Sequence, residues 1–104
     1  MMKSETYLDF CFIREMTGQL ASEVQSMFEQ LFKYERLHWY LDEKEEEGAE
    51  IVVAEVKGMS KWGSEQEVID YLEEHASEQF WCVLQGYQFQ VLPVVRGCST
   101  SGKR

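Results

Sequence analysis

This chain of 104 residues has no long apolar run, no closely spaced cysteines and few basic side chains. No apolar stretch reaches the roughly 18 residues that a membrane-spanning helix needs. The first residues, MMKSETYLDFCFIR, include acids and lack the continuous apolar segment of a signal peptide. We therefore expect a cytoplasmic protein that does not contact a membrane. The length fits one domain, and 44% hydrophobic residues are enough for a packed core.

The three cysteines predict neither a disulfide framework nor a metal site, because their number is odd and no two are close in the sequence. Cys11 and Cys82 lie in the apolar runs DFCFI and FWCVL, which favours a role as small core residues. Cys98 lies in the polar segment GCSTSGKR, where we expect it to be exposed. No metal and no cofactor are expected.

Positive charge is scarce: the chain has 10 basic and 19 acidic residues, and its net charge is −9. Direct nucleic-acid binding is not expected, since phosphate contacts need clustered Lys and Arg. The acids concentrate in two places, the run DEKEEE at Asp42–Glu47 and the second predicted helix with its C-terminal flank, which carry Glu65, Glu67, Asp70, Glu73, Glu74 and Glu78. These acids form either a solvated surface or a negative face that attracts a basic partner.

Motifs of catalysis are also missing. The sequence contains no P-loop, no GxGxxG, no GxSxG elbow and no HExxH. His38 and His75 lie on different predicted elements and have no metal-like spacing to other ligands. Acids within charge runs are usually solvated and are poor candidates for a general acid or base. An enzymatic function is therefore not favoured.

Hydrophobic periodicity predicts the first four elements. Tyr7–Ile13 alternates as a strand, and the stripe from Leu20 to Phe32 repeats every three or four residues as an amphipathic helix, with Thr17 as its N-cap. Leu37–Asp42 and Ile51–Val56 read as two more strands. The polar stretch EKEEEG between them is the predicted loop of a β-hairpin.

The second half predicts a helix and one further β segment. Ser64 and Glu67 form a capping box, and Val68, Ile69, Leu72 and Ala76 form the buried stripe of a helix that ends near Ser77. Phe80–Val95 is either one long strand, with or without a bulge, or a hairpin that turns at Gln85-Gly86. Its unbroken alternation favours the strand, and Pro93 indicates a sheet edge. Residues 1–96 form one domain, followed by a flexible polar tail at 97–104.

The predicted fold is an α+β two-layer sandwich of order β-α-β-β-α-β. This is the order of the ferredoxin-like fold, in which two helices cover one face of an antiparallel sheet. An extra C-terminal strand arises if Phe80–Val95 is a hairpin. Both phases of the strands carry bulky side chains, so the open sheet face is expected to contact a second copy, giving a homodimer, or a different partner.

These observations favour a non-enzymatic module that binds another protein. We expect a small acidic inhibitor, immunity protein or anti-defence factor that neutralises a basic protein target, such as one that handles nucleic acid. The predicted partner-binding residues are five acids of the predicted loop region and four aromatic side chains: Asp42, Glu43, Glu45, Glu46, Glu47, Trp39, Tyr40, Trp62 and Trp81.

Two alternatives remain open. One is a dimeric domain that binds a small molecule, or a small enzyme, with a pocket between the helices and the sheet. Its polar groups would be Tyr7, His38, Tyr40 and Tyr87, and convergence of these side chains in a closed cavity would favour it. The other is an accessory subunit without an activity of its own.

Overall fold

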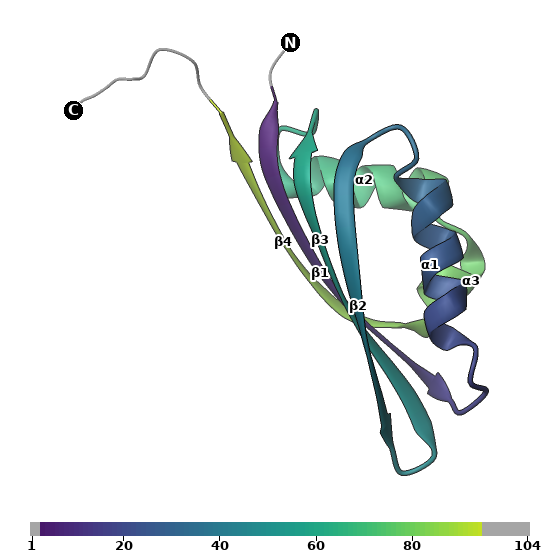
Figure 1. Ribbon diagram of the computed structural model, residues 1–104. Coiled ribbons are helices and arrows are strands. Elements are labelled where there is room, and N and C mark those ends of the chain that lie inside the picture. Colours follow the sequence, from purple (N-terminus) through teal and green to yellow (C-terminus); the bar gives the residue numbers. More distant parts are fainter. Residues whose placement is uncertain (1–2, 95–104) are drawn as a thin grey trace.

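The computed structural model describes residues 3–94, which form a four-stranded sheet with helices against one of its faces (Figure 1). In the order of the chain, the elements are β1 (Ser4–Glu15), α1 (Leu20–Leu31), β2 (Arg36–Glu46), β3 (Ala49–Ser60), α2 (Glu65–His75), α3 (Glu78–Val83) and β4 (Leu84–Pro93). The expected α+β class is confirmed. Among the helices of residues 3–94, none is long and apolar enough to cross a membrane.

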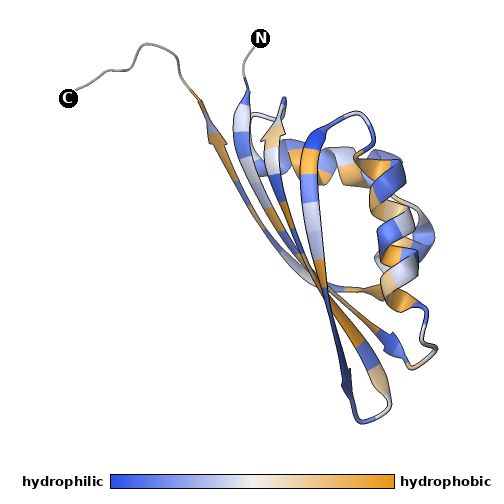
Figure 2. Cartoon of the chain, in the orientation of Figure 1, coloured by the Kyte–Doolittle hydropathy of each residue, from blue (hydrophilic) through white to orange (hydrophobic). Residues whose placement is uncertain are grey.

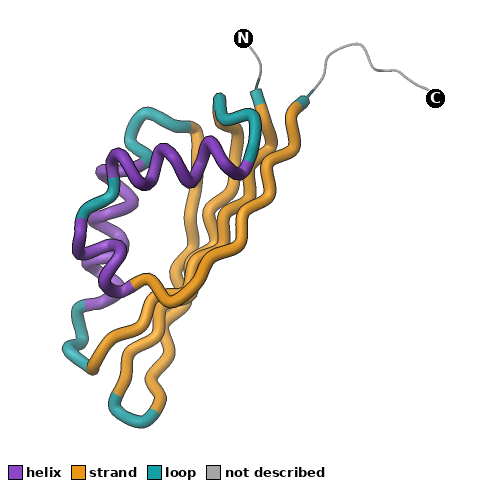
Figure 3. Tube along the Cα trace, turned by 180° about the vertical axis from the view of Figure 1, so that it is seen from behind, coloured by secondary structure: helices purple, strands orange, loops and turns teal. Residues whose placement is uncertain are grey.

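The strands lie in the order β2-β3-β1-β4, and every neighbouring pair is antiparallel. β1 and β3 pair along their whole length, from Ser4 opposite Ser60 to Glu15 opposite Ala49. β4 pairs with β1 only as far as Phe12. The ends of β1, β2 and β3 therefore project beyond β4 and beyond the helices, which Figure 3 shows from behind.

The core lies between the sheet and the helices because side chains alternate along each strand. Leu8, Phe10 and Phe12 of β1 are buried, as their spacing predicted. Phe10 and Phe12 pack against Phe28 of α1 and Phe80 of α3, with ring centroids 5.3–6.0 Å apart. Hydrophobic and hydrophilic residues accordingly alternate along the strands and helices in Figure 2.

The Ser64 half of the predicted capping box is present at the start of α2, but the Glu67 side chain reaches back to Gly63 N rather than to Ser64 N. Ser64 Oγ accepts a hydrogen bond from Glu67 N at 3.3 Å, and Glu67 Oε1 accepts one from Gly63 N at 3.1 Å. Val68 and Leu72 are buried, as predicted. The predicted N-cap of α1 was wrong: the helix begins at Leu20 with Gln19 in the cap position, and no side chain of Gln19 caps it.

The prediction of one strand over Phe80–Val95 was wrong at its start. Glu78–Val83 forms the short helix α3, because Ser77 Oγ caps it by accepting from Phe80 N at 3.2 Å. Phe80 and Val83, three residues apart, both point into the core. β4 begins only at Leu84, and the alternative turn at Gln85-Gly86 is a shift of the β1–β4 register instead.

Two further expectations need correction. Cys82 is exposed on α3 rather than a core residue, whereas Cys11 is half-buried on the helix-free face of β1. The polar hairpin loop is also shorter than predicted: β2 runs on to Glu46, and only Glu47 and Gly48 form the turn. Both have positive φ, 50° and 82°, as a tight hairpin turn requires. Val95, Cys98 and the predicted tail at 97–104 lie outside the described residues.

Candidate functional site

The acidic hairpin, Asp42–Glu47, lies at the end of the molecule that projects past the helices (Figure 1). All six of its side chains are exposed, and five of them are acidic. Figure 2 shows this end of β2 as strongly hydrophilic. Because most of these acids stand on a strand, the ladder to β3 fixes the spacing of their carboxylates.

The register divides these charges between the two faces of the hairpin. Opposite pairs such as Asp42 with Val53 place Asp42, Lys44 and Glu46 on the helix-free face. Glu43 and Glu45 occupy the other face. No helix covers the hairpin at this point, so both faces present negative charge to the solvent.

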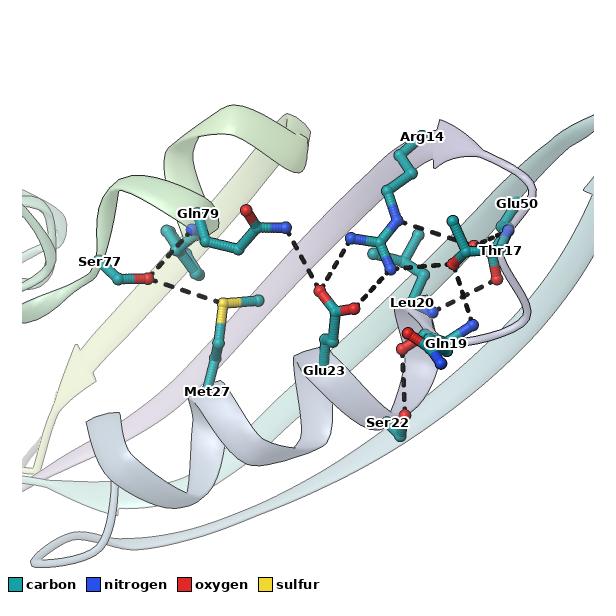
Figure 4. A network of polar contacts seen from close by, with 11 residues as sticks. Arg14, Thr17, Gln19, Leu20, Ser22, Glu23, Met27, Glu50, Ser77 and Gln79 are labelled. Atoms are coloured by element: carbon teal, nitrogen blue, oxygen red, sulfur yellow. Dashed lines mark hydrogen bonds and ion pairs between the residues drawn. The ribbon is translucent and has the colours of Figure 1, made fainter.

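A buried carboxylate connects the base of the hairpin to the rest of the fold. Glu50, the second residue of β3, is only 6% exposed. Its Oε2 accepts hydrogen bonds from Thr17 Oγ1 at 2.6 Å and from Thr17 N at 2.8 Å (Figure 4). Its Oε1 accepts from Leu20 N, the first residue of α1, at 3.3 Å. These bonds, led by that from the Thr17 hydroxyl, lower the pKa of Glu50.

Arg14 of β1 stands beside this carboxylate. Its Nη1 and Nη2 each donate to one carboxylate oxygen of Glu23 at 2.8 Å, which is a bidentate ion pair. Its Nε lies 3.8 Å from Glu50 Oε2. Hydrogen bonding from Arg14 lowers the pKa of Glu23. Together with the bond from Met16 N to Gly48 O at 2.9 Å, these contacts hold the hairpin in a fixed position relative to α1.

The aromatic residues next to the acidic hairpin differ in exposure. Tyr40 is 61% exposed on the helix-free face, with Lys57 Nζ 5.4 Å from its ring centroid. Trp39 points to the helix side and is half-buried against Phe28 and Phe32. Its Nε1 donates to Gln25 Oε1 at 2.9 Å. Both aromatic side chains lie on the strand that carries the acids.

The other two predicted anchors lie elsewhere. Trp62 is only 4% exposed and packs against Phe32 and Tyr71, so it belongs to the core. Trp81 is 37% exposed, but it lies on α3, which leads into the opposite edge of the sheet. The structure therefore brings the acidic hairpin together with Tyr40 and Trp39, and not with Trp62 or Trp81.

The helix-free face carries less aromatic surface than expected. Phe89 lies opposite Leu8 and so faces the helix layer, where Tyr87 stacks on it at 4.7 Å. Tyr7 and Tyr40 are on the helix-free face, as is His38. The four polar groups of the small-molecule alternative are therefore divided between the two sides of the sheet and do not converge in one cavity.

A groove of about 420 Å³ runs across the β2 edge of the sheet, next to the acidic hairpin. It is lined by Gln25 of α1 and by Leu37, His38, Trp39 and Tyr40 of β2. This groove could not be predicted from the sequence, because Gln25 and Trp39 come together only when α1 packs on the sheet. Glu50 could have been noticed, since it shares the phase of the apolar residues Val52, Ala54 and Val56.

No known family model matches this sequence, and no curated protein is significantly similar to it. What the site can do therefore follows from its own chemistry. Within residues 3–94 there is no group of three His, Cys, Asp or Glu side chains arranged to hold a metal ion. Exposed carboxylates on a fixed strand suit electrostatic attraction better than proton transfer, which needs a singled-out, perturbed group.

Proposed function

We propose that this protein is a small acidic binding module that neutralises a basic protein target, as an inhibitor, immunity protein or anti-defence factor does. The observation that carries the proposal is the acidic hairpin: five acids and one lysine on a projecting, firmly held pair of strands. A basic surface of the kind that handles nucleic acid is the matching partner. The free thiols of Cys11 and Cys82 suit the reducing cytoplasm, which we propose as its location.

Local electrostatics supports an attractive role for the hairpin. Lys44 is the only basic residue within it, so its five carboxylates are largely uncompensated. Glu50 at its base adds a further negative charge and is held ionised by its hydrogen bonds. Concentrated charge of one sign accelerates the encounter with a partner of the opposite sign.

The neighbouring aromatic residues provide contact area. Tyr40 is 61% exposed, and Trp39 lines the groove. Tyr and Trp are enriched among the residues that dominate binding energy in interfaces. Charge would then guide the partner, and the two rings would contribute to the lifetime of the complex.

We also propose that the sandwich is a variant of the ferredoxin-like fold. The order of elements supports this, as does the sheet, in which β3 lies between β1 and β2, and β1 lies between β3 and β4. The short helix α3 is an addition before the last strand. Such a fold serves many functions, so the proposed function rests on the hairpin and not on the fold.

The test begins with affinity capture from the native host at low and moderate salt, followed by identification of the bound protein. A hairpin-neutralised variant carries Asp42→Asn, Glu43→Gln, Glu45→Gln and Glu46→Gln. A helix-neutralised control removes the same four charges from exposed positions of α2 and α3, with Asp70→Asn, Glu73→Gln, Glu74→Gln and Glu78→Gln.

We expect the wild type and the helix-neutralised control to capture the same basic protein. The hairpin-neutralised variant should bind that protein at least about tenfold more weakly, which corresponds to about 1.4 kcal/mol. Capture of a protein that is not basic would contradict the proposal, and so would equal affinities of the two neutralised variants.

A further inference from the structure

We propose that the basic partner binds by adding an extended segment to the free edge of β2 as a fifth strand of the sheet. This inference rests on the proposed function and specifies where and how the partner binds. It is carried by three features: the outward backbone groups of β2, the groove beside them, and the acids that continue the same strand. Edge-strand addition provides affinity through main-chain hydrogen bonds and specificity through alternate side chains.

The hydrogen-bond phase of the sheet shows which backbone groups of β2 point outward. In an antiparallel ladder, hydrogen-bonded and non-bonded pairs alternate. Met16 N donates to Gly48 O, which makes Met16 and Gly48 a hydrogen-bonded pair at the end of the β1–β3 ladder. Because bonded pairs recur at every second residue, the even-numbered residues of β3 bond to β1 and the odd-numbered ones bond to β2. The β2 residues opposite the even-numbered ones therefore direct their N–H and C=O groups away from the sheet; these are Leu37, Trp39, Leu41, Glu43 and Glu45.

The groove lies along the outward groups of Leu37 and Trp39. Its lining comes from both sides of the edge, with Leu37 and Trp39 on the helix side and His38 and Tyr40 on the helix-free side. Gln25 of α1 closes its helix side and is itself held by Trp39 Nε1 at 2.9 Å. An added strand would place every second side chain over Trp39 and the alternate ones beside Tyr40.

The other edge of the sheet is blocked at two of its outward positions. Val91 N of β4 donates to Glu65 Oε2 at 2.8 Å, so a side chain of α2 already occupies this outward position. Two residues further on, Pro93 has no N–H to offer. Native sheets protect their edges in such ways. No such side-chain bond is made to the outward N–H groups of Leu37, Trp39, Leu41 or Glu43 among the described residues.

The negative charge of β2 favours a basic segment as the strand that binds at this edge. Beyond the groove, the same strand continues into Asp42, Glu43, Glu45 and Glu46. A second copy of this chain would bring another net charge of −9 to this edge, which repulsion opposes. A segment that alternates apolar and basic residues satisfies both parts of β2: apolar side chains over Trp39 and basic ones beside the acids.

The first experiment uses synthetic peptides with the full-length protein. The probe is an acetylated and amidated peptide of five Lys-Val repeats, measured at low salt by titration. Two modified forms each carry two backbone N-methyl groups, either both on one edge of the extended peptide or one on each edge. Methylation removes amide donors but keeps the charge, and a peptide methylated on one edge can still present its other edge to β2.

We expect the unmethylated and the one-edge peptides to bind alike. The peptide methylated on both edges should bind about tenfold more weakly, because it loses hydrogen bonds on whichever edge it presents. In the bound protein, hydrogen exchange of the Leu37, Trp39 and Leu41 amides should slow. Equal binding of all three peptides, no binding of the unmethylated peptide, or unchanged exchange would overturn strand addition.

The second experiment compares Glu43→Pro with Glu43→Gln. Both remove one charge, but only proline removes the outward N–H, and an edge strand tolerates proline at such a position. We expect Glu43→Pro to bind the unmethylated peptide several-fold more weakly than Glu43→Gln, with an unchanged amide spectrum outside β2. Equal affinity would overturn strand addition. Dimerisation of the wild type that Glu43→Pro abolishes would also overturn it, because the occupant would then be a second copy.

Failure of strand addition is distinguishable from failure of the proposed function. Peptides that bind equally well with any methylation, but more weakly to the hairpin-neutralised variant, would leave the proposed function intact. The proposed function itself fails if the captured protein is not basic, or if the hairpin-neutralised and helix-neutralised variants bind it equally.

Discussion

Glu50 shows how one side chain fixes the position of the candidate site. It lies on the helix-facing side of β3, where the next residues on the same face are apolar. Its carboxylate accepts hydrogen bonds from Thr17 in the loop before α1. A carboxylate at the start of a helix also interacts favourably with the helix dipole. Its hydrogen bonds to Thr17 and Leu20 replace the side-chain cap that Gln19 does not provide.

Replacing this carboxylate should make stability less dependent on acid pH. The hydrogen bonds from Thr17 lower the pKa of Glu50 in the folded state. Its stabilisation is therefore full above the pKa of the unfolded chain, about 4.3 for Glu, and is lost as the pH falls through the lower folded pKa. We expect Glu50→Gln to unfold at lower urea concentration than the wild type at pH 7, with the difference shrinking below about pH 4.3.

Glu55→Gln, at an exposed position of the same strand, is the matched control for the loss of one charge. A difference between wild type and Glu50→Gln that stays constant from neutral to strongly acidic pH would contradict this role of Glu50.

Trp62 and Trp81 provide a contrast at the same scale. Trp62 is enclosed by Phe32 and Tyr71, whereas Trp81 has one free side. We expect Trp62→Ala to lower the free energy of unfolding by about 3–5 kcal/mol, as truncation of a buried aromatic ring does. Trp81→Ala should cost clearly less. Urea denaturation measures both, and a loss for Trp62→Ala no larger than that for Trp81→Ala would show that Trp62 is not a core residue.

The β2–β3 hairpin depends on a turn of only two residues. Gly48 adopts a positive φ without strain, but Glu47 does so at a cost, because side chains disfavour the left-handed region. Asparagine tolerates this conformation far better and is common in such turns. Glu47→Asn should therefore raise the free energy of unfolding by about 0.5–1 kcal/mol.

Glu46→Asn is its control, because it removes an equal charge from a strand residue next to the turn. Thermal unfolding of the two variants separates the effects: stabilisation by Glu47→Asn alone supports the two-residue turn. Equal shifts in both variants would indicate that only the loss of charge matters.

The elements with a clear period could be predicted from the sequence, and those without one could not. The apolar stripe of α1 and the alternation of Leu8, Phe10 and Phe12 each fit one structure only. The far half of β2 is all polar and so shows no alternation; its pairing with β3 makes it a strand. Phe80–Val83 fits an alternating pattern as well as one helical turn, and only the Ser77 cap distinguishes them.

The candidate site was predictable in part for the same reason. Charge is visible in the sequence, so the acids from Asp42 to Glu47 stand out as a cluster, and the structure shows all of them exposed on one hairpin. Which aromatic residues join them depends on packing: Trp39 and Tyr40 share their strand, while Trp62 faces the core. The free edge and its groove depend on the order of strands, which no local pattern specifies.

At the scale of the whole molecule, the two ends of the sheet differ in their cover: helices pack on one end and leave the other end exposed. One end is covered by the helices and holds the core. The other end extends as a hairpin whose acids lie at the free edge of the sheet, and the opposite edge is blocked by Glu65 and Pro93. This asymmetry is the basis for the proposal that a basic partner binds at the negatively charged β2 edge.

The most direct test of the central claim is the association rate with the captured basic protein as a function of salt. Electrostatic attraction weakens as the Debye length falls from about 30 Å at 0.01 M salt to about 10 Å at 0.1 M. We expect the rate for the wild type and for the helix-neutralised control to fall steeply over this range. The hairpin-neutralised variant should associate about tenfold more slowly at low salt and respond only weakly to added salt. Equal rates and equal salt dependence for the two neutralised variants would show that the acidic hairpin does not attract the partner.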